Sequence, residues 1–240
     1  MLDAKVLAII PARAGSKRIP GKNIKKFLGK PLVEYAIKQA LKLSFVGRVI
    51  VDTDSSEIAR IARSVGAEAP YLRPKYLAGD TAQVVDSILY LLEQLEKTEK
   101  YIPTHIMILQ VTSPLREIGD INKVWEMMQN TDATTVLTVC ETHPRLYHLS
   151  PDNDIILVNG SEKQSTNIQA WPKGYLLNGC FVYIVNAEAL KKEKLIITKK
   201  TKAVICPKWR SVDLDTPEEW VLAEFLYKNK KQIKSRIKKI

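Results

Sequence analysis

A stretch near the N-terminus gathers cationic side chains where an anionic ligand could bind. The sequence IPARAGSKRIPGKN, residues 10–23, contains Arg13, Lys17, Arg18 and Lys22. It follows VLAII, an apolar run whose length and flanking residues are typical of a buried strand. Ligands of open α/β sheets bind at the carboxyl ends of strands, where backbone amides and cations can hold phosphate groups. The stretch therefore predicts a polyphosphate-binding loop, and a solvated basic turn is the alternative.

This loop differs from a Walker P-loop. The Walker pattern has four residues between its glycines and Ser or Thr after its Lys. Here five residues separate Gly15 from Gly21, and Asn23 follows Lys22. Pro20 also removes a backbone amide donor from the middle of the loop. The sequence therefore excludes a P-loop and favours a different kind of phosphate site.

Two carboxylates in SVDLDT, residues 211–216, suit a divalent cation. The alternation predicts a short strand that carries Asp213 and Asp215 on one side and its apolar residues toward the core. Mg²⁺ generally takes one or two carboxylates and completes its octahedron with water and substrate phosphate. The alternative is a helix cap at Asp215, ahead of Pro217. We expect a Mg²⁺ site at Asp213 and Asp215, with either Asp215 or Thr216 as the cap.

Polar side chains also follow a second apolar run. In ILQVTSPLR, residues 108–116, Gln110, Thr112 and Ser113 stand at the carboxyl end of a predicted buried strand. Amide and hydroxyl groups in this place suit a polyhydroxylated ligand. Turn chemistry is the alternative, because Ser-Pro is a common start of a loop. The residues alone leave both interpretations open.

Strands and amphipathic helices alternate through the first 140 residues, and this order must position the polar groups. The segments in chain order are VLAII, PLVEYAIKQALKL, RVIVDTD, SSEIARIARSVG, TAQVVDSILYLLEQLEK, HIMILQ, REIGDINKVWEMMQ and ATTVLTVC. Alternation of this kind predicts an α/β fold with a mainly parallel sheet flanked by helices on both faces.

The pattern changes after Cys140. Residues from about 141 to 180 predict a small inserted antiparallel dimerisation subdomain, because no Gly/Ser linker precedes them. YLLNGCFVYIV is expected to form one longer strand, and a helical pattern resumes over residues 216–227. We therefore expect a single catalytic α/β domain over residues 1–227 that contains the insert, followed by a basic C-terminal tail over residues 228–240.

The net charge of +11 is concentrated at the C-terminus. Residues 228–240 contain seven Lys and Arg and no acid, which leaves +4 for the rest of the chain. Such a run is typical of a solvated or frayed helix end. The alternative is contact with a polyanion or a membrane surface, but no RNA-binding signature or interleaved aromatic residues accompany it. We expect no nucleic-acid partner.

The cysteines and the N-terminus indicate a cytoplasmic protein. Cys140, Cys180 and Cys206 are far apart and form no C-x-x-C pair, which is typical of core thiols in a reducing compartment. The N-terminal apolar run is too short for a membrane span and lacks a small-residue cleavage site. We expect no membrane span.

The motifs together resemble those of one family. ARAGSKRIPGKN, LRPKYLAGDTA, LQVTSPLR, QAWPKGYLLNG and SVDLDT occur in the order and at roughly the separations found in the acylneuraminate cytidylyltransferases, which include the CMP-sialic acid synthetases and their nonulosonate relatives. The resemblance covers residues 6 to about 226. It implies a fold of the nucleotide-diphospho-sugar transferase type, used as a homodimer whose protruding subdomain helps to close the partner's site.

The resemblance also implies roles for individual residues. CTP and a 2-keto-3-deoxy sugar acid would be the substrates, Mg²⁺ the cofactor, and Arg13 and Lys22 the catalytic residues. The implied nucleotide-binding residues are Arg13, Ser16, Lys17, Lys22, Asn23, Arg73, Asp80, Thr81 and Ala82. The implied sugar-binding residues are Gln110, Thr112, Ser113, Gln169, Tyr175 and Asn178.

Three positions depart from the family pattern. Asn167 and Ile168 stand where many relatives have arginines, Tyr183 lies one residue later than usual, and Gln83 replaces a small hydroxyl residue. These departures bear on the acceptor sugar and not on CTP. The resemblance favours a sialic-type nonulosonic acid, with 3-deoxy-manno-octulosonate, legionaminate or pseudaminate as alternatives. A nucleic-acid-binding protein that uses its basic tail is the alternative from a different class.

Overall fold

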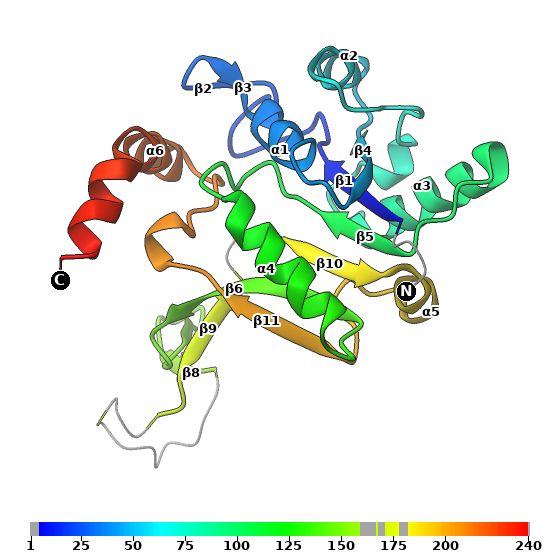
Figure 1. Cartoon of the computed structure of the whole chain (residues 1–240). Helices are drawn as coiled ribbons and strands as arrows, with labels where there is room; N and C mark the ends of the chain where they lie inside the picture. Colours follow the sequence, from blue (N-terminus) through cyan, green and yellow to red (C-terminus); the bar gives the residue numbers. More distant parts are fainter. Residues whose placement is uncertain (1–4, 159–166, 168–170, 178–181, 240) are drawn as a thin grey trace.

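A central sheet organises the chain (Figure 1). The computed structural model describes residues 5–158, 167, 171–177 and 182–239. The strands of the main path follow the spatial order β11-β6-β10-β5-β1-β4. Their bounds are β1 (Val6–Pro11), β4 (Val46–Asp52), β5 (His105–Ile108), β6 (Thr135–Thr142), β10 (Tyr183–Asn186) and β11 (Thr201–Ile205). Only β10 on this path is antiparallel to its neighbours, so the predicted mainly parallel sheet is confirmed.

Helices cover both faces of the sheet, as predicted. One face packs against α1 (Leu32–Ala40), α2 (Ser56–Val65), α4 (Ile118–Gln129) and α6 (Pro217–Ile237). The other packs against α3 (Val84–Glu99) and α5 (Ala187–Glu193). The apolar run of β1 is explained by burial on both faces of the sheet. Ala8 and Ile10 belong to the first core, and Leu7 and Ile9 belong to the second. A strand buried on both faces needs apolar residues at every position.

Helix α6 is longer than predicted. It begins with a capping box, in which the Thr216 hydroxyl accepts from Glu219 N–H and the Glu219 carboxylate accepts from Thr216 N–H. The predicted end at residue 227 is wrong, because the helix continues to Ile237. No Gly or Pro interrupts residues 218–237, and Lys234 pairs with Glu117 at 2.6 Å. Most of the predicted basic tail is thus the last part of this helix.

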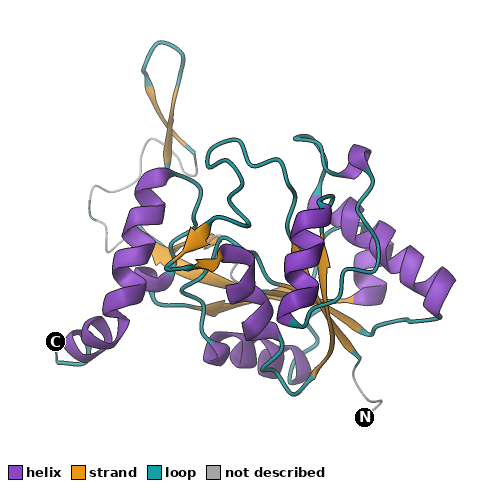
Figure 2. Cartoon of the chain, turned by 90° about the horizontal axis from the view of Figure 1, so that it is seen from above, coloured by secondary structure: helices purple, strands orange, loops and turns teal. Residues whose placement is uncertain are grey.

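The insert after β6 contains a hairpin of β7 (Tyr147–Leu149) and β8 (Ile155–Leu157), which projects from the body of the molecule (Figure 2). Strand β9 (Gly174–Leu177) then pairs with β6 in antiparallel fashion. The single long strand predicted here is wrong. Leu177 pairs with Val139 and Tyr183 with Leu137, so β9 and β10 do not continue one another in a single register along β6.

Short elements complete the described chain. They are β2 (Lys26–Phe27), β3 (Lys30–Pro31) and the 3₁₀ turns η1 (Lys75–Leu77) and η3 (Lys208–Arg210). Cys140 and Cys206 are buried thiols that form no disulfide with another described residue, whereas Cys180 lies outside the described residues. Within the described part of the chain, no helix combines the length and apolar character needed to cross a membrane.

Candidate functional site

A cavity opens at the carboxyl ends of β1 and β5, beside the N-terminal basic loop. Its volume is about 530 Å³, which lies within the usual range of ligand pockets. Ten of the residues predicted from the sequence line it, namely Arg13, Ser16, Lys17, Lys22, Asn23, Arg73, Asp80, Gln110, Thr112 and Asp215. These residues come from four separate stretches of the sequence, and the parallel sheet brings the stretches to one edge.

The basic loop is braced from within and from the segment that follows β4. The backbone N–H of Ala14 donates to Asp54 Oδ1 at 2.8 Å. The side-chain amide of Asn23 donates to the Arg13 carbonyl at 2.8 Å. Gly21 has a φ of 63°, a conformation that glycine adopts without steric cost. The structure thus gives Asn23 a bracing role across the loop, and its contact with phosphate stays a prediction.

Asp80 holds two cations on one side of the cavity. Its carboxylate lies 2.5 Å from Lys17 Nζ and 3.4 Å from Arg13 Nη1. The hydrogen bond from Lys17 is the main cause that lowers the pKa of Asp80 below its ordinary value. Arg13 also donates to the Gly79 carbonyl at 3.1 Å. The segment after η1 therefore fixes the direction in which the Arg13 guanidinium points.

Asp215 holds two further loop cations. Its oxygens lie 2.8 Å from Lys22 Nζ and 2.7 Å from Arg18 Nη1. The hydrogen bond from Lys22 is the largest cause that lowers the pKa of Asp215. The Lys22 side chain is 13% exposed and that of Arg18 is 69% exposed. Arg18 was predicted only as one cation of the loop, and its position in the basic run was the sole signal for it.

Arg73 lies in the wall of the cavity in a buried ion pair with Asp52, the last residue of β4. Its Nη2 is 2.6 Å from Asp52 Oδ2, and its Nε is 3.1 Å from Oδ1. Nη2 also donates to the Asp52 carbonyl at 3.0 Å. Both side chains are almost fully buried. Breaking such a pair by removing one partner typically costs about 3–5 kcal/mol, so Arg73 has a structural role here besides the predicted contact with a nucleobase.

The segment with the two aspartates is a turn and not the predicted strand. Asp215 N–H donates to the Asp213 carbonyl at 3.0 Å, which closes the backbone too tightly for an extended ladder. Leu214 is nevertheless fully buried and Val212 packs against the core. The predicted alternation of apolar and acidic residues is therefore kept without a strand. Thr216 and not Asp215 accepts the capping hydrogen bond of α6.

Asp213 carries an unsatisfied buried oxygen. No group among the described residues hydrogen-bonds its Oδ1. The pKa of Asp213 is raised to about 6, mainly by burial and partly by the charge of Asp215, while a hydrogen bond with Thr112 acts in the opposite direction. Asp213 and the neighbouring Asp215 could together bind a hard cation, which would coordinate the unsatisfied Oδ1 of Asp213. No group of three or more potential His, Cys, Asp or Glu ligands occurs in the described part of the chain.

Five of the remaining predicted residues are described and do not line this cavity, namely Thr81, Ala82, Ser113, Tyr175 and Asp213. Thr81 and Ala82 follow Asp80 near its margin, with Thr81 exposed, and Ser113 is fully buried. Tyr175 is 42% exposed on β9. Gln169 and Asn178 lie outside the described residues. The roles of these residues stay predictions.

Sequence reasoning missed the apolar wall of the cavity, to which Ile19 and Val84 contribute. In a single sequence, such residues cannot be distinguished from residues of the hydrophobic core.

Comparisons with known proteins agree with the geometry. A family model described as cytidylyltransferase matches residues 7–165. The chain belongs to this cytidylyltransferase family. CMP-N,N'-diacetyllegionaminic acid synthase of Legionella pneumophila is 34% identical over 92% of this chain and 96% of its own length. A pseudaminic acid cytidylyltransferase of Campylobacter jejuni is 32% identical over 93% of this chain and 97% of its own length. The resemblance inferred from the motifs is thereby confirmed.

The fold of this cytidylyltransferase is also found among solved structures. The structure of CMP:2-keto-3-deoxy-manno-octonic acid synthetase complexed with CTP matches with a TM-score of 0.67. The match covers 95% of this chain and 100% of the other, at 18% sequence identity. At that identity the match concerns the fold, and it confirms the predicted nucleotide-diphospho-sugar transferase type of architecture.

Proposed function

We propose that this cytidylyltransferase transfers CMP from CTP to the anomeric hydroxyl of a nonulosonic acid and releases pyrophosphate. One observation carries the proposal: four loop cations and the two carboxylates that hold them, Asp80 and Asp215, line the same cavity at the carboxyl edge of the sheet. Cations at this place suit a triphosphate, and hydroxyl and amide groups at Gln110 and Thr112 suit a sugar. The names of the similar proteins support the same reaction.

The proposed reaction is an in-line displacement at phosphorus. The anomeric oxygen forms a bond to the α-phosphorus, the bond from that phosphorus to the β-bridging oxygen breaks, and the hydroxyl proton passes to solvent. Negative charge grows on the bridging and nonbridging oxygens as pyrophosphate leaves. Fixed cations that face these oxygens stabilise the transition state more than the ground state. We assign this role to Lys22 and Arg13, because both are held in place by carboxylates.

Mg²⁺ is the proposed cofactor. Asp213 and Asp215 would hold it, since Asp213 has a free buried oxygen and Asp215 is its neighbour in the same turn. When bound, the metal would neutralise triphosphate charge. Asp215 also pairs with Lys22 and Arg18, which would keep these cations beside the metal and the phosphates.

The first prediction concerns substrate choice. With Mg²⁺, the enzyme should release pyrophosphate from CTP in the presence of a nonulosonic acid, and CTP should exceed ATP and GTP by about 10³-fold in kcat/KM. A site that hydrogen-bonds one base edge leaves buried groups unpaired with another base. Pyrophosphate release is measured across a panel of sialic acid, legionaminate, pseudaminate and 3-deoxy-manno-octulosonate. Equal rates with all three nucleotides, or no release with any of these acids, would contradict the proposal.

We also propose that the enzyme is a cytoplasmic homodimer. The hairpin exposes apolar side chains to a degree unusual for a monomer, with Leu149 at 65% and Ile155 at 67% exposure, and Leu177 on β9 at 49%. Leu149 and Ile155 are also paired across the hairpin. The buried thiols Cys140 and Cys206 suit a reducing compartment.

The second prediction tests the homodimer. Light scattering should give the mass of two chains for the wild type. Leu149→Lys combined with Ile155→Lys should give the mass of one chain with unchanged circular dichroism, because a dimer interface does not tolerate two buried unpaired ammonium groups. Val221→Lys is the matched control, since Val221 is 70% exposed on α6, and it should stay dimeric. A monomeric wild type would overturn the proposal.

A further inference from the structure

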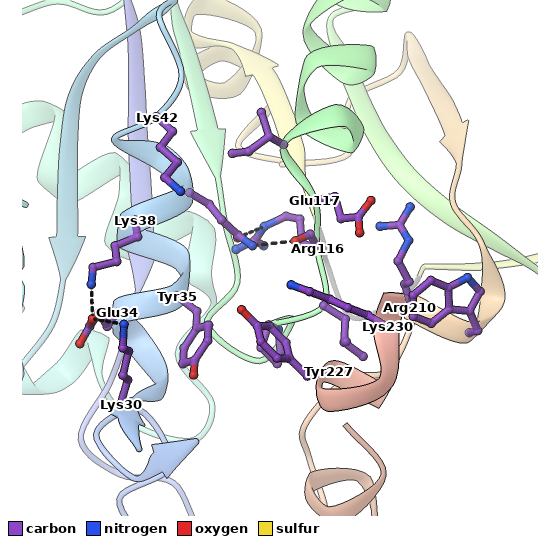
Figure 3. Close-up of a pocket in the computed structure, with 15 residues that line it drawn as sticks. Lys30, Glu34, Tyr35, Lys38, Lys42, Arg116, Glu117, Arg210, Tyr227 and Lys230 are labelled. Atoms are coloured by element: carbon purple, nitrogen blue, oxygen red, sulfur yellow. Dashed lines mark hydrogen bonds and ion pairs between the residues drawn. The ribbon is translucent and has the colours of Figure 1, made fainter. Parts of the chain in front are cut away.

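A second cavity lies away from the nucleotide site, between α1, the turn that follows β5, η3 and α6 (Figure 3). Its volume is about 310 Å³, which is enough for a small metabolite. It shares no lining residue with the first cavity. Neither the proposed transfer reaction nor its metal uses any side chain in it, so its chemistry needs a separate explanation.

Aromatic rings form much of its wall. Tyr35 from α1 and Tyr227 from α6 meet edge to face, with ring centroids 5.5 Å apart. The Tyr35 hydroxyl donates to the Phe27 carbonyl at 2.8 Å, so its ring is fixed. Trp209 of η3 lines the cavity from a third element. Walls of this kind suit a flat or apolar group of a ligand.

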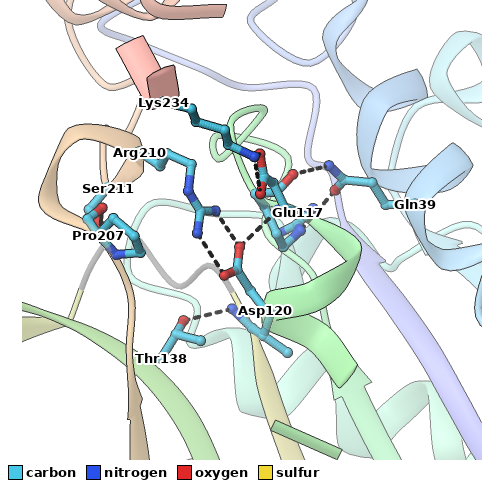
Figure 4. A network of polar contacts seen from close by, with 10 residues as sticks. Gln39, Glu117, Asp120, Thr138, Pro207, Arg210, Ser211 and Lys234 are labelled. Atoms are coloured by element: carbon cyan, nitrogen blue, oxygen red, sulfur yellow. Dashed lines mark hydrogen bonds and ion pairs between the residues drawn. The ribbon is translucent and has the colours of Figure 1, made fainter. Parts of the chain in front are cut away.

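The acidic groups at this cavity are already neutralised. Glu34 lies 2.5 Å from Lys38 Nζ, and Glu117 lies 2.6 Å from Lys234 Nζ. Farther in, Asp120 accepts two hydrogen bonds from Arg210, one of them at 2.8 Å (Figure 4). The carboxylates therefore do not neutralise the other cations that line the cavity.

Lys42 and Lys230 carry positive charge at this cavity that the carboxylates described above do not neutralise. Within the described chain, no carboxylate forms an ion pair with Lys42 at the end of α1 or with Lys230 of α6. The Lys230 ammonium lies over the Tyr227 ring, 4.2 Å from its centroid, and extends from α6 toward α1 in Figure 3. A positive group held on an aromatic ring beside an open cavity attracts an anion with little loss of side-chain entropy.

A buried arginine completes the lining. Arg116 is 3% exposed, donates from Nε to the Gln39 amide oxygen at 2.9 Å and from Nη1 to the Gln110 carbonyl at 3.2 Å. Gln39 returns a hydrogen bond to the Arg116 carbonyl at 2.7 Å. Burial lowers the pKa of Arg116 to about 9, with the charge of Asp120 opposing part of the effect. The guanidinium stays charged at neutral pH, and an oxyanion at this wall would stabilise it.

We propose that this cavity is a second ligand site, which binds a small molecule that carries an oxyanion group, phosphate or carboxylate, next to a flat ring. The oxyanion lies toward Lys42, Lys230 and Arg116, and the ring lies against Tyr35, Tyr227 and Trp209. The proposal does not depend on the transfer reaction, because it concerns different residues and is tested by binding alone.

The test is calorimetric titration of the full chain with phenyl phosphate, with benzoate and with uncharged benzyl alcohol. The two anions separate a phosphate from a carboxylate headgroup. Lys42→Met combined with Lys230→Met keeps the apolar stems and removes both charges, and should weaken binding of the preferred anion by about tenfold or more. Lys123→Ala, on the exposed side of α4, is the matched surface control. Lys22→Gln reports binding at the nucleotide cavity instead, and neither it nor Lys123→Ala should change the affinity.

The outcomes are distinct. Binding of phenyl phosphate or benzoate that is lost in the double variant and kept in Lys22→Gln supports the site. Loss in Lys22→Gln alone would place the anion in the nucleotide cavity and overturn the proposal. It would equally be overturned if benzyl alcohol bound as tightly as the anions, or if neither anion bound at millimolar concentration. Each of these results leaves the transfer reaction to its own test of pyrophosphate release.

Discussion

Lys22→Gln is expected to lower turnover with CTP by about 100-fold or more while the fold stays intact. Lys22 is a compact ammonium with a side chain only 13% exposed, and it is held 2.8 Å from Asp215 at the wall of the nucleotide cavity. Such a group can approach phosphate oxygens closely, and loss of one transition-state contact typically costs about 10²–10³ in rate. Glutamine keeps most of the volume and removes the charge. Pyrophosphate release at saturating CTP is the measurement.

Lys26→Gln is the matched control for this change. Lys26 is exposed on β2, near Lys22 in the sequence, and does not line the nucleotide cavity. It should keep wild-type turnover, and circular dichroism should be unchanged for both variants. If Lys22→Gln turned over at the wild-type rate at saturating CTP, Lys22 would have no electrostatic role in the reaction. A change confined to KM would indicate that Lys22 binds ground state and transition state equally.

Asp213→Asn and Asp215→Asn are expected to weaken Mg²⁺-dependent activity severely, with partial rescue at high Mg²⁺ or Mn²⁺. Asparagine keeps the size and one oxygen but removes the charge that competes with water for a hard cation. The structure sharpens this prediction, because Thr216 with Glu219 caps α6. Neither substitution therefore removes the helix cap, and stability should survive both.

Metal binding itself should be measured as well as activity. Mn²⁺ titration followed by electron paramagnetic resonance should show weaker binding in both variants. Glu218→Gln is the control, because Glu218 is exposed in the first turn of α6 and removes one charge near the same place. Wild-type turnover at low Mg²⁺ in both aspartate variants, together with unchanged Mn²⁺ affinity, would remove these residues from the metal site.

The sequence was most informative where side chains follow buried strands. The loop with Lys22 and the residues Gln110 and Thr112 were predicted at the carboxyl ends of strands, and the structure places them around one cavity, which Asp215 also lines. This succeeded because an apolar run specifies a strand, and parallel strands put their carboxyl ends on the same side. Chain order and local pattern are enough for that argument.

Pairings between distant residues could not be predicted in the same way. Arg73 pairs with Asp52, and Arg18 pairs with Asp215 across 197 positions of the chain. No local pattern records which carboxylate a given arginine meets. The cavity between α1 and α6 was missed for a related reason. Its lysines and tyrosines lie on two amphipathic helices, and in a single sequence such residues look like ordinary solvated or core-facing positions.

The prediction of secondary structure failed in two segments whose conformation depends on tertiary contacts. YLLNGCFVYIV has the apolar content of one strand, yet β9 and β10 pair with β6 as two separate segments. The aspartate segment has the alternation of a strand, yet the hydrogen bond from Asp215 to the Asp213 carbonyl makes it a turn. Both segments are too short for periodicity to separate a strand from an extended or turning loop.

The way the insert joins the sheet makes it a separable module. Its two ends meet where Thr142 of β6 pairs with Gly174 of β9. The chain therefore leaves and re-enters the domain at one place, which we call the neck of the insert. A Cβ at Gly174 would lie 2.8 Å from Pro144 Cα, which explains why the neck needs a glycine. Everything beyond the neck can change in length or sequence without moving a strand of the core. Changes within this insert would therefore leave in place the residues that line the cavity beside the N-terminal basic loop, because none of them lies between positions 143 and 173.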